Sequence, residues 1–190
     1  MKPLIIYFSR TSNNENLAMQ LQQRLNCPIK VIVDNKKQRS TFSLLLTTVL
    51  GLNTPITLPD IPFQDHDRFI LVAPIWAGRI AGPMQTFIRR YKSRLTTVSF
   101  ATICGGQPGQ REKIYRQLTR LTGKDPASLL ELQLKHLLAA QNPPSAPHAG
   151  NYRMQPADWA FFDEPITRFA ADLDPTIGKS RSTQVAWQIK

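Results

Sequence analysis

The sequence predicts a doubly wound α/β fold, in which helices cover both faces of a parallel sheet. Short apolar segments rich in β-branched and aromatic residues alternate along the chain with segments that carry apolar residues at helical spacing. Strands buried on both faces have such uninterrupted apolar runs, and amphipathic helices have such stripes. The alternation of the two favours parallel strands joined by helices.

Strands are expected in four segments rich in β-branched and aromatic residues: residues 3–8, 27–33, 69–73 and 98–103. The first of these has no polar residue, as expected of a strand buried on both faces. A fifth is contested, because Asp125-Pro126 is able to start a helix that the following leucines would suit. Leucines at 130, 132 and 134 nevertheless alternate with polar residues, which favours a strand over 130–134.

Helices are expected between these strands. Leu17, Leu21 and Leu25 repeat at four-residue spacing and predict a helix over 13–25. A similar stripe from Phe42 to Leu50 predicts a helix over 42–51 that Gly51 terminates. Two further helices are expected, one from after Arg79 to about 92 and one over 110–122.

The C-terminal part of the chain is expected to add one more helix. Asp163 has the character of an N-cap, Pro165 fits a first turn, and an apolar stripe runs from Ile166 to Leu173. Residues 142–157 are rich in Pro, Ala and Gly and are expected to form an irregular loop. We therefore expect one domain over residues 1–174 and an irregular tail over 175–190.

Composition narrows the class of protein. The 190 residues suffice for one domain, and no apolar run approaches the roughly 20 residues that cross a bilayer. The apolar start of the chain is too short for a signal peptide, so a cytoplasmic location is expected. Cys27 and Cys104 fall at opposite edges of the predicted sheet, beyond disulfide reach, and are expected to be free thiols.

The formal net charge of +11 raises the question of a polyanionic partner. The densest basic run, Arg89–Arg94, closes a predicted helix, where the helix dipole favours cations. No helix-turn-helix, zinc-finger or RNA-binding signature accompanies it, which favours solvated helix faces over a specific nucleic-acid site. His66, His136 and His148 have no metal-ligand spacing, so no metal site is expected.

Three loops should meet at the carboxyl edge of the sheet, where open α/β sheets bind their ligands. The first contains hydroxyl and amide side chains before a helix, an arrangement suited to a phosphate, although the same residues are common N-caps. The second has a tryptophan that offers a flat face to an aromatic ligand, or else packs as a lid on the core. The third has paired glycines that allow close backbone approach. The loops are Ser9–Asn14, Pro74–Pro83 and Thr102–Gly109.

Together these loops resemble the flavodoxin family, in particular its short single-domain oxidoreductases. The segment 5–14 is similar to the family's first strand and FMN-phosphate loop, 73–79 to a loop that flanks the isoalloxazine ring, and 100–106 to the fourth strand and last flavin loop. The resemblance runs in order to about residue 134. It implies a five-stranded parallel sheet of order 2-1-3-4-5 and FMN as cofactor.

The resemblance also implies which residues would contact FMN. The phosphate would lie against Ser9, Arg10, Thr11, Ser12, Asn13 and Asn14. The ring would lie between Pro74, Ile75, Trp76, Ala77, Gly78 and Arg79 on one side and Cys104, Gly105, Gly106 and Gln107 on the other. The family usually has Gly in place of Ser12 and Thr or Ser in place of Asn14. Cys104 has no His or second Cys beside it, so it is not assigned a catalytic role.

The expected function is FMN-dependent transfer of electrons or hydride to a quinone or similar small acceptor, as in the NAD(P)H:quinone reductases. The cofactor supplies such chemistry, and the protein positions it. Two alternatives stay open: a one-electron carrier that docks on a partner enzyme, and a flavin-free binding protein of the same fold. A homodimer is also open.

Overall fold

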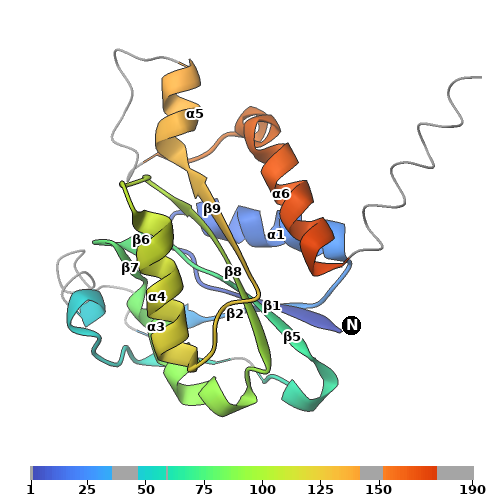
Figure 1. Cartoon of the computed structure of the whole chain (residues 1–190), viewed down its shortest axis with the longest axis vertical. Helices are drawn as coiled ribbons and strands as arrows, with labels where there is room; N and C mark the ends of the chain where they lie inside the picture. The colour runs from blue at the N-terminus through green and yellow to red at the C-terminus, as the bar shows by residue number, and fades with distance from the viewer. Residues whose placement is uncertain (1, 36–46, 59, 142–151, 175–190) are drawn as a thin grey trace, which may run out of the picture.

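Five parallel strands form the central sheet in the order β2-β1-β5-β8-β9 (Figure 1). The computed structural model describes residues 2–35, 47–58, 60–141 and 152–174. The strands are β1 (Pro3–Tyr7), β2 (Ile29–Val31), β5 (Arg68–Val72), β8 (Thr97–Cys104) and β9 (Ser128–Gln133). The expected order 2-1-3-4-5 is therefore confirmed, and the contested fifth segment is a strand.

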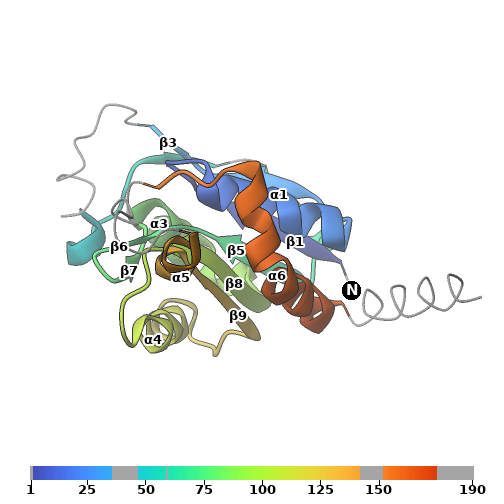
Figure 2. The same cartoon turned by 90° about the horizontal axis from the view of Figure 1, so that it is seen from above.

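Helices cover both faces of this sheet (Figure 2). On one face lie α1 (Asn13–Leu25) and α6 (Trp159–Leu173), and on the other lie α3 (Gly82–Tyr91) and α4 (Gln110–Thr122). Alternate residues of β1 enter the two cores, because a strand points successive side chains to opposite faces. Ile5 packs under α1 and α6, whereas Leu4 and Ile6 pack under α3, and all three are fully buried.

The second strand is shorter than the expected segment 27–33. Pro28 has no N–H to donate, and it contributes only its carbonyl, which accepts a bond from Ile5. After Ile32 the chain leaves the sheet, and β3 (Val33–Asp34) pairs antiparallel with β4 (Ile56–Thr57). Of the helix expected over 42–51, residues 47–50 are helical and Gly51 follows with φ 66°, while residues 42–46 lie outside the described part.

The chain after β9 differs from expectation. Leu134, Leu137 and Leu138 are buried on an additional helix, α5 (Leu134–Gln141), which was not predicted. Leu134 therefore begins a helix and does not end the strand. The spacing of these leucines is helical. It was overlooked because Leu134 also continues the alternating pattern of the strand before it.

The last helix begins earlier than predicted. Asp163 is not its N-cap: α6 starts at Trp159, directly after the 3₁₀ turn Pro156–Asp158. There the side chain of Asp158 accepts the Gln155 backbone N–H and completes a capping box. Asp163 instead accepts a hydrogen bond from Arg24 at 2.5 Å, and Pro165 lies inside the helix. Of the loop expected over 142–157, residues 142–151 lie outside the described part, as does the tail 175–190.

Two further properties of the described residues bear on the expectations. Cys27 and Cys104 are both free, as predicted. None of the described helices has the length and apolar character that crossing a membrane requires.

Candidate functional site

The three predicted loops lie together at the carboxyl edge of the sheet. Val72 is in register with Tyr7 on one side and with Ala101 on the other, so the central strands end side by side. Direct contacts then join the loops. Phe8 packs against Trp76, and the Gln110 side chain donates to the Gly78 carbonyl at 3.3 Å.

The first loop leads into α1 through a residue of positive φ. Ser12 has φ 68° and ψ −14°, the left-handed conformation that glycine adopts most readily. Its side chain does not cap the helix, so it leaves the first N–H groups of α1 without a side-chain partner. Unpaired N–H groups at a helix N-terminus, together with the helix dipole, favour an anion at this point.

Ser9 provides a second group directed to the same loop. Its Oγ is buried and has no hydrogen-bond partner among the described residues. A buried hydroxyl without a partner is unfavourable by about 1–3 kcal/mol, so it marks a place where a ligand oxygen would be stabilised. Thr11 is half-buried beside it, and Arg10 is exposed.

Asn13 and Asn14 use their side chains within the fold. The Asn14 amide donates to the Ile103 carbonyl at 3.1 Å and accepts the Ile103 N–H at 3.0 Å. The Asn13 amide donates to the Tyr152 carbonyl at 2.7 Å and accepts the Met154 N–H at 3.0 Å. Both residues are buried. Their contribution to an anion would therefore come from backbone N–H groups more than from their amides.

The second loop is a β-hairpin that the sequence did not predict. Its strands are β6 (Ile75–Trp76) and β7 (Arg79–Ile80), and its turn is Ala77 with φ 48° and Gly78 with φ 75°. Two consecutive positive φ angles define a tight hairpin turn of the kind that favours glycine. The half-buried Trp76 meets the Phe8 ring edge-on, with centroids 5.7 Å apart, so the residue directly before the first loop holds the indole in place. Pro74 accepts the Ala81 N–H at the base of the hairpin.

The third loop bends sharply at Gly106, which has φ 85°. A Cβ at this position would lie 2.9 Å from the Cβ of Gln133, so only glycine fits without movement of β9. Gly105 is half-buried and Gln107 is exposed.

Cys104 ends β8 as a protonated thiol. Its Sγ lies 3.5 Å from a Glu131 carboxylate oxygen. Burial raises the pKa of Cys104 to about 12, and the negative charge of Glu131 adds to the rise. A thiol with so high a pKa stays neutral at physiological pH.

Sequence reasoning missed the segment that supports the first loop. Tyr152 and Met154 contact Asn13, and the Tyr152 hydroxyl donates to Asp158 at 2.8 Å. Asp158 also accepts the Gln141 amide at 2.5 Å. Burial alone would raise the pKa of Asp158, but the bonds from Gln155, Gln141 and Tyr152 hold that pKa below its ordinary value. The spacing of Gln155 and Asp158 is the sequence signal that could have identified this turn.

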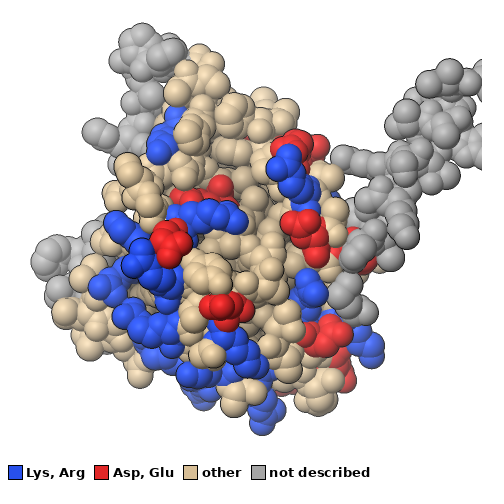
Figure 3. Space-filling model, viewed as in Figure 1, with Lys and Arg blue, Asp and Glu red and all other residues tan. Residues whose placement is uncertain are grey.

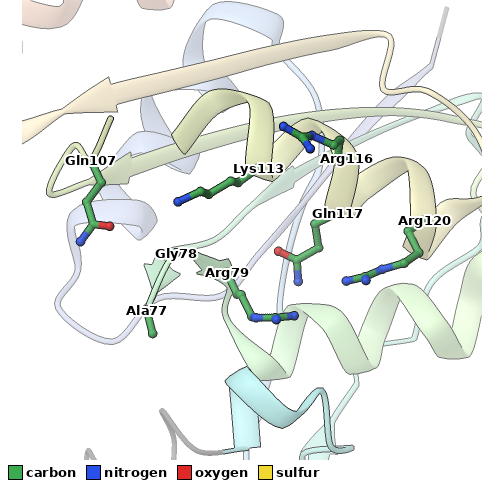
Figure 4. A pocket seen from close by; sticks show the side chains of 8 residues that line it. All are labelled: Ala77, Gly78, Arg79, Gln107, Lys113, Arg116, Gln117 and Arg120. Carbon is green, nitrogen blue, oxygen red and sulfur yellow. The ribbon is translucent and has the colours of Figure 1, made fainter. Parts of the chain in front are cut away.

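Arg79, at the end of the second group of predicted residues, is half-buried. It lies with basic residues of α4 around a pocket beside the hairpin (Figure 4). Among the described residues, no group of three or more His, Cys, Asp or Glu side chains is placed to hold a metal ion.

Comparison with known proteins identifies the fold. No protein-family model and no curated protein matches the sequence. Among solved structures, the FMN complex of a flavoprotein from Lactobacillus acidophilus NCFM is similar at 17% identity and a TM-score of 0.61, covering 68% of this chain and 92% of that one. A flavodoxin described as WrbA-like from Agrobacterium tumefaciens has 13% identity and a TM-score of 0.51, covering 89% of this chain and 94% of that one.

An NAD(P)H:quinone oxidoreductase from Methanothermobacter marburgensis has 13% identity and a TM-score of 0.50, covering 90% of this chain and 95% of that one. At such identities the likeness establishes architecture and leaves activity to be argued from the site. The strand order and these similarities together show that the chain has the flavodoxin-like fold.

Proposed function

We propose that the carboxyl edge binds FMN and that the protein is an oxidoreductase passing electrons or hydride from the reduced flavin to a quinone or similar small acceptor. The observation that carries the proposal is the buried Ser9 Oγ without a partner, next to the uncapped N-terminus of α1. The Ser9 hydroxyl and the first N–H groups of α1 are hydrogen-bond donors without an acceptor, and a phosphate monoester supplies acceptor oxygens.

The residues present fit a phosphate group despite the two departures from the family pattern. Ser12 stands where glycine is usual, yet it adopts the left-handed backbone that the glycine would supply. Asn14 stands where a hydroxyl residue is usual, and its amide ties α1 to the end of β8. Ser9, Thr11 and the first N–H groups of α1 would hold the phosphate.

The ring would lie between the other two loops. Trp76, Ala77 and Gly78 form one wall, and Cys104, Gly105 and Gly106 form the other. FMN supplies one- and two-electron chemistry when bound. The chain's own residues would position it: Phe8 fixes the Trp76 indole, and the neutral Cys104 thiol adds no charge near the ring. The FMN complex and the quinone oxidoreductase of the same fold support this function.

The test compares Ser9→Ala with Ser93→Ala, which makes the same substitution at an exposed serine of the 3₁₀ turn Lys92–Arg94 that follows α3. Fluorescence titration of the flavin-free protein should show FMN binding roughly tenfold weaker in Ser9→Ala and unchanged in Ser93→Ala. Riboflavin, which has no phosphate, should bind both variants alike. Equal FMN affinity in the two variants would contradict binding of the FMN phosphate at this loop.

Turnover tests the reaction. The FMN-loaded protein, supplied with NAD(P)H and a soluble quinone, should consume both in steady state without a partner protein. Reduction of bound FMN without turnover would instead favour the one-electron carrier.

A further inference from the structure

A strongly basic pocket lies beside the proposed flavin site. Its volume is about 580 Å³, and four basic side chains line it: Arg79, Lys113, Arg116 and Arg120. The first comes from the β6–β7 hairpin and the other three from α4. Basic residues gather over this helix on the molecular surface (Figure 3). The volume lies in the range of small-molecule sites.

Three of these four charges have no acidic partner. Arg116 pairs with Glu112 at 3.0 Å. In the described part of the chain, Arg79, Lys113 and Arg120 form no ion pair with any carboxylate. Cations held around one cavity repel one another, and a bound anion would turn that repulsion into attraction. The pocket therefore favours a ligand with more than one negative charge.

The Gln117 side chain adds a neutral hydrogen-bond donor among these basic residues. It is only 6% exposed, and its Oε1 accepts the Ile80 N–H at 2.9 Å. Its Nε2 is buried with no hydrogen-bond partner among the described residues. In Figure 4 the Gln117 side chain extends between Arg79 and Arg120. The bond to Ile80 fixes which end of the amide is the donor, and that donor requires an acceptor.

The pocket is continuous with a wall of the proposed ring site. Ala77, Gly78 and Gln107 line it as well, and all three belong to the loops that would flank the flavin. A ligand could thus place its anionic end against α4 and its other end near the turn of the hairpin.

We propose that this pocket binds the diphosphate of a nucleotide-type co-substrate, with its phosphate oxygens on Arg79, Lys113, Arg120 and the Gln117 amide. That the ligand exchanges electrons with flavin rests on the proposed function, whereas the anion site itself does not. Arginine and a neutral amide donor together suit phosphate oxygens, since the arginine fork matches their geometry.

The test is calorimetric titration with inorganic pyrophosphate and with ADP, on FMN-loaded protein so that the phosphate loop is already filled. Arg120→Gln and Gln117→Glu should each weaken both probes roughly tenfold. Gln117→Glu keeps the acceptor for Ile80 and replaces the donor with a negative charge. Arg111→Gln removes an equal charge from an exposed position of the same helix and should change affinity less than about twofold.

Three results would overturn the proposal: no binding of either probe at millimolar concentration, an equal loss in Arg111→Gln and Arg120→Gln, or tighter binding of a short single-stranded RNA that all three variants weaken alike. ADP binding no tighter than pyrophosphate binding would overturn the nucleotide part.

FMN affinity separates this proposal from the function on which it rests. It should be the same in Arg120→Gln, Gln117→Glu and the unchanged protein. If FMN does not bind at all, the same titrations on the flavin-free protein still compare Arg120→Gln with Arg111→Gln, so the two proposals fail independently.

Discussion

Two regions of the molecule, the β1–α1 loop and the pocket beside α4, offer an environment for anions, and they do so by different means. The β1–α1 loop offers backbone N–H groups and the Ser9 hydroxyl, while its amide side chains are engaged in holding the loop in shape. The pocket between the β6–β7 hairpin and α4 offers charged side chains from exposed helix positions. The first depends on fixed geometry and the second on Coulomb attraction, so different perturbations should affect each.

The largest effect is expected at Asn14, which fixes the geometry of the first region. In Asn14→Ala the buried N–H and carbonyl of Ile103 lose their side-chain partner, which should lower the free energy of unfolding by about 2–4 kcal/mol. Urea unfolding measures this. Asn16→Ala, on the same helix and without a side-chain hydrogen bond, should change stability by less than about 0.5 kcal/mol. Similar losses in both variants would show that Asn14 does not connect loop and sheet.

The Asp158 network should give a smaller, pH-dependent effect on the same region. Its folded pKa lies below the ordinary value, so its stabilisation is fully present above about pH 4 and is lost as pH falls through the folded pKa. Asp158→Asn should lower stability by about 1–2 kcal/mol at pH 7.

Urea unfolding at pH 7 and again near pH 3 should show that this difference shrinks under acid. Asp172→Asn, at an exposed position of α6, should show no difference at either pH. The role of the ionised carboxylate would be contradicted if the free energies of unfolding of Asp158→Asn and the unchanged protein differed by the same amount at both pH values.

Ser12 should respond to substitution through its backbone alone. Ser12→Gly keeps the left-handed conformation but removes the steric cost that the Cβ of serine adds to it. This should raise stability by about 0.5–1 kcal/mol, after allowance for the extra freedom of glycine in the unfolded chain. Ser12→Val should act in the opposite direction, because β-branching makes φ 68° more unfavourable. FMN affinity should follow the same order. Stabilisation by valine would refute this backbone argument.

The two regions should also differ in how strongly salt weakens anion binding, a test that needs no substitution in the protein. Raising NaCl from about 0.05 to 0.3 M shortens the Debye length and should weaken pyrophosphate binding at the α4 pocket several-fold. FMN affinity should fall less, because its phosphate would meet N–H groups and hydroxyls. Parallel salt dependences would mean that both anions are held mainly by charge.

The sequence was informative where the structure depends on local pattern. Alternating apolar runs and stripes identified the five strands of the sheet and the four helices that pack on its faces. The start of α6 was misjudged, because Asp163-x-Pro165 resembles a helix start as closely as the capping box before it does. The hairpin after Pro74 was missed, because each of its strands has only two residues.

The roles of the site residues depended on distant partners. Asn13 and Asn14 were expected beside the phosphate, and that prediction stands for their backbone N–H groups. Their side-chain amides contact residues 141 and 89 positions further along the chain, which no local pattern reveals. The basic pocket was also missed as a unit. Lys113, Arg116 and Arg120 stand three and four residues apart, a spacing that suits one helix face, but only the fold brings Arg79 to them.

The central claim is that the β1–α1 loop recognises a phosphate through fixed N–H and hydroxyl donors. Titration of the flavin-free protein with FMN and with riboflavin, followed by flavin fluorescence, tests it most directly. We expect FMN to bind at least about 100-fold more tightly than riboflavin, as two charge-assisted hydrogen bonds would produce. Equal affinities, or no binding of either flavin, would contradict the claim and leave a flavodoxin-like fold with another use.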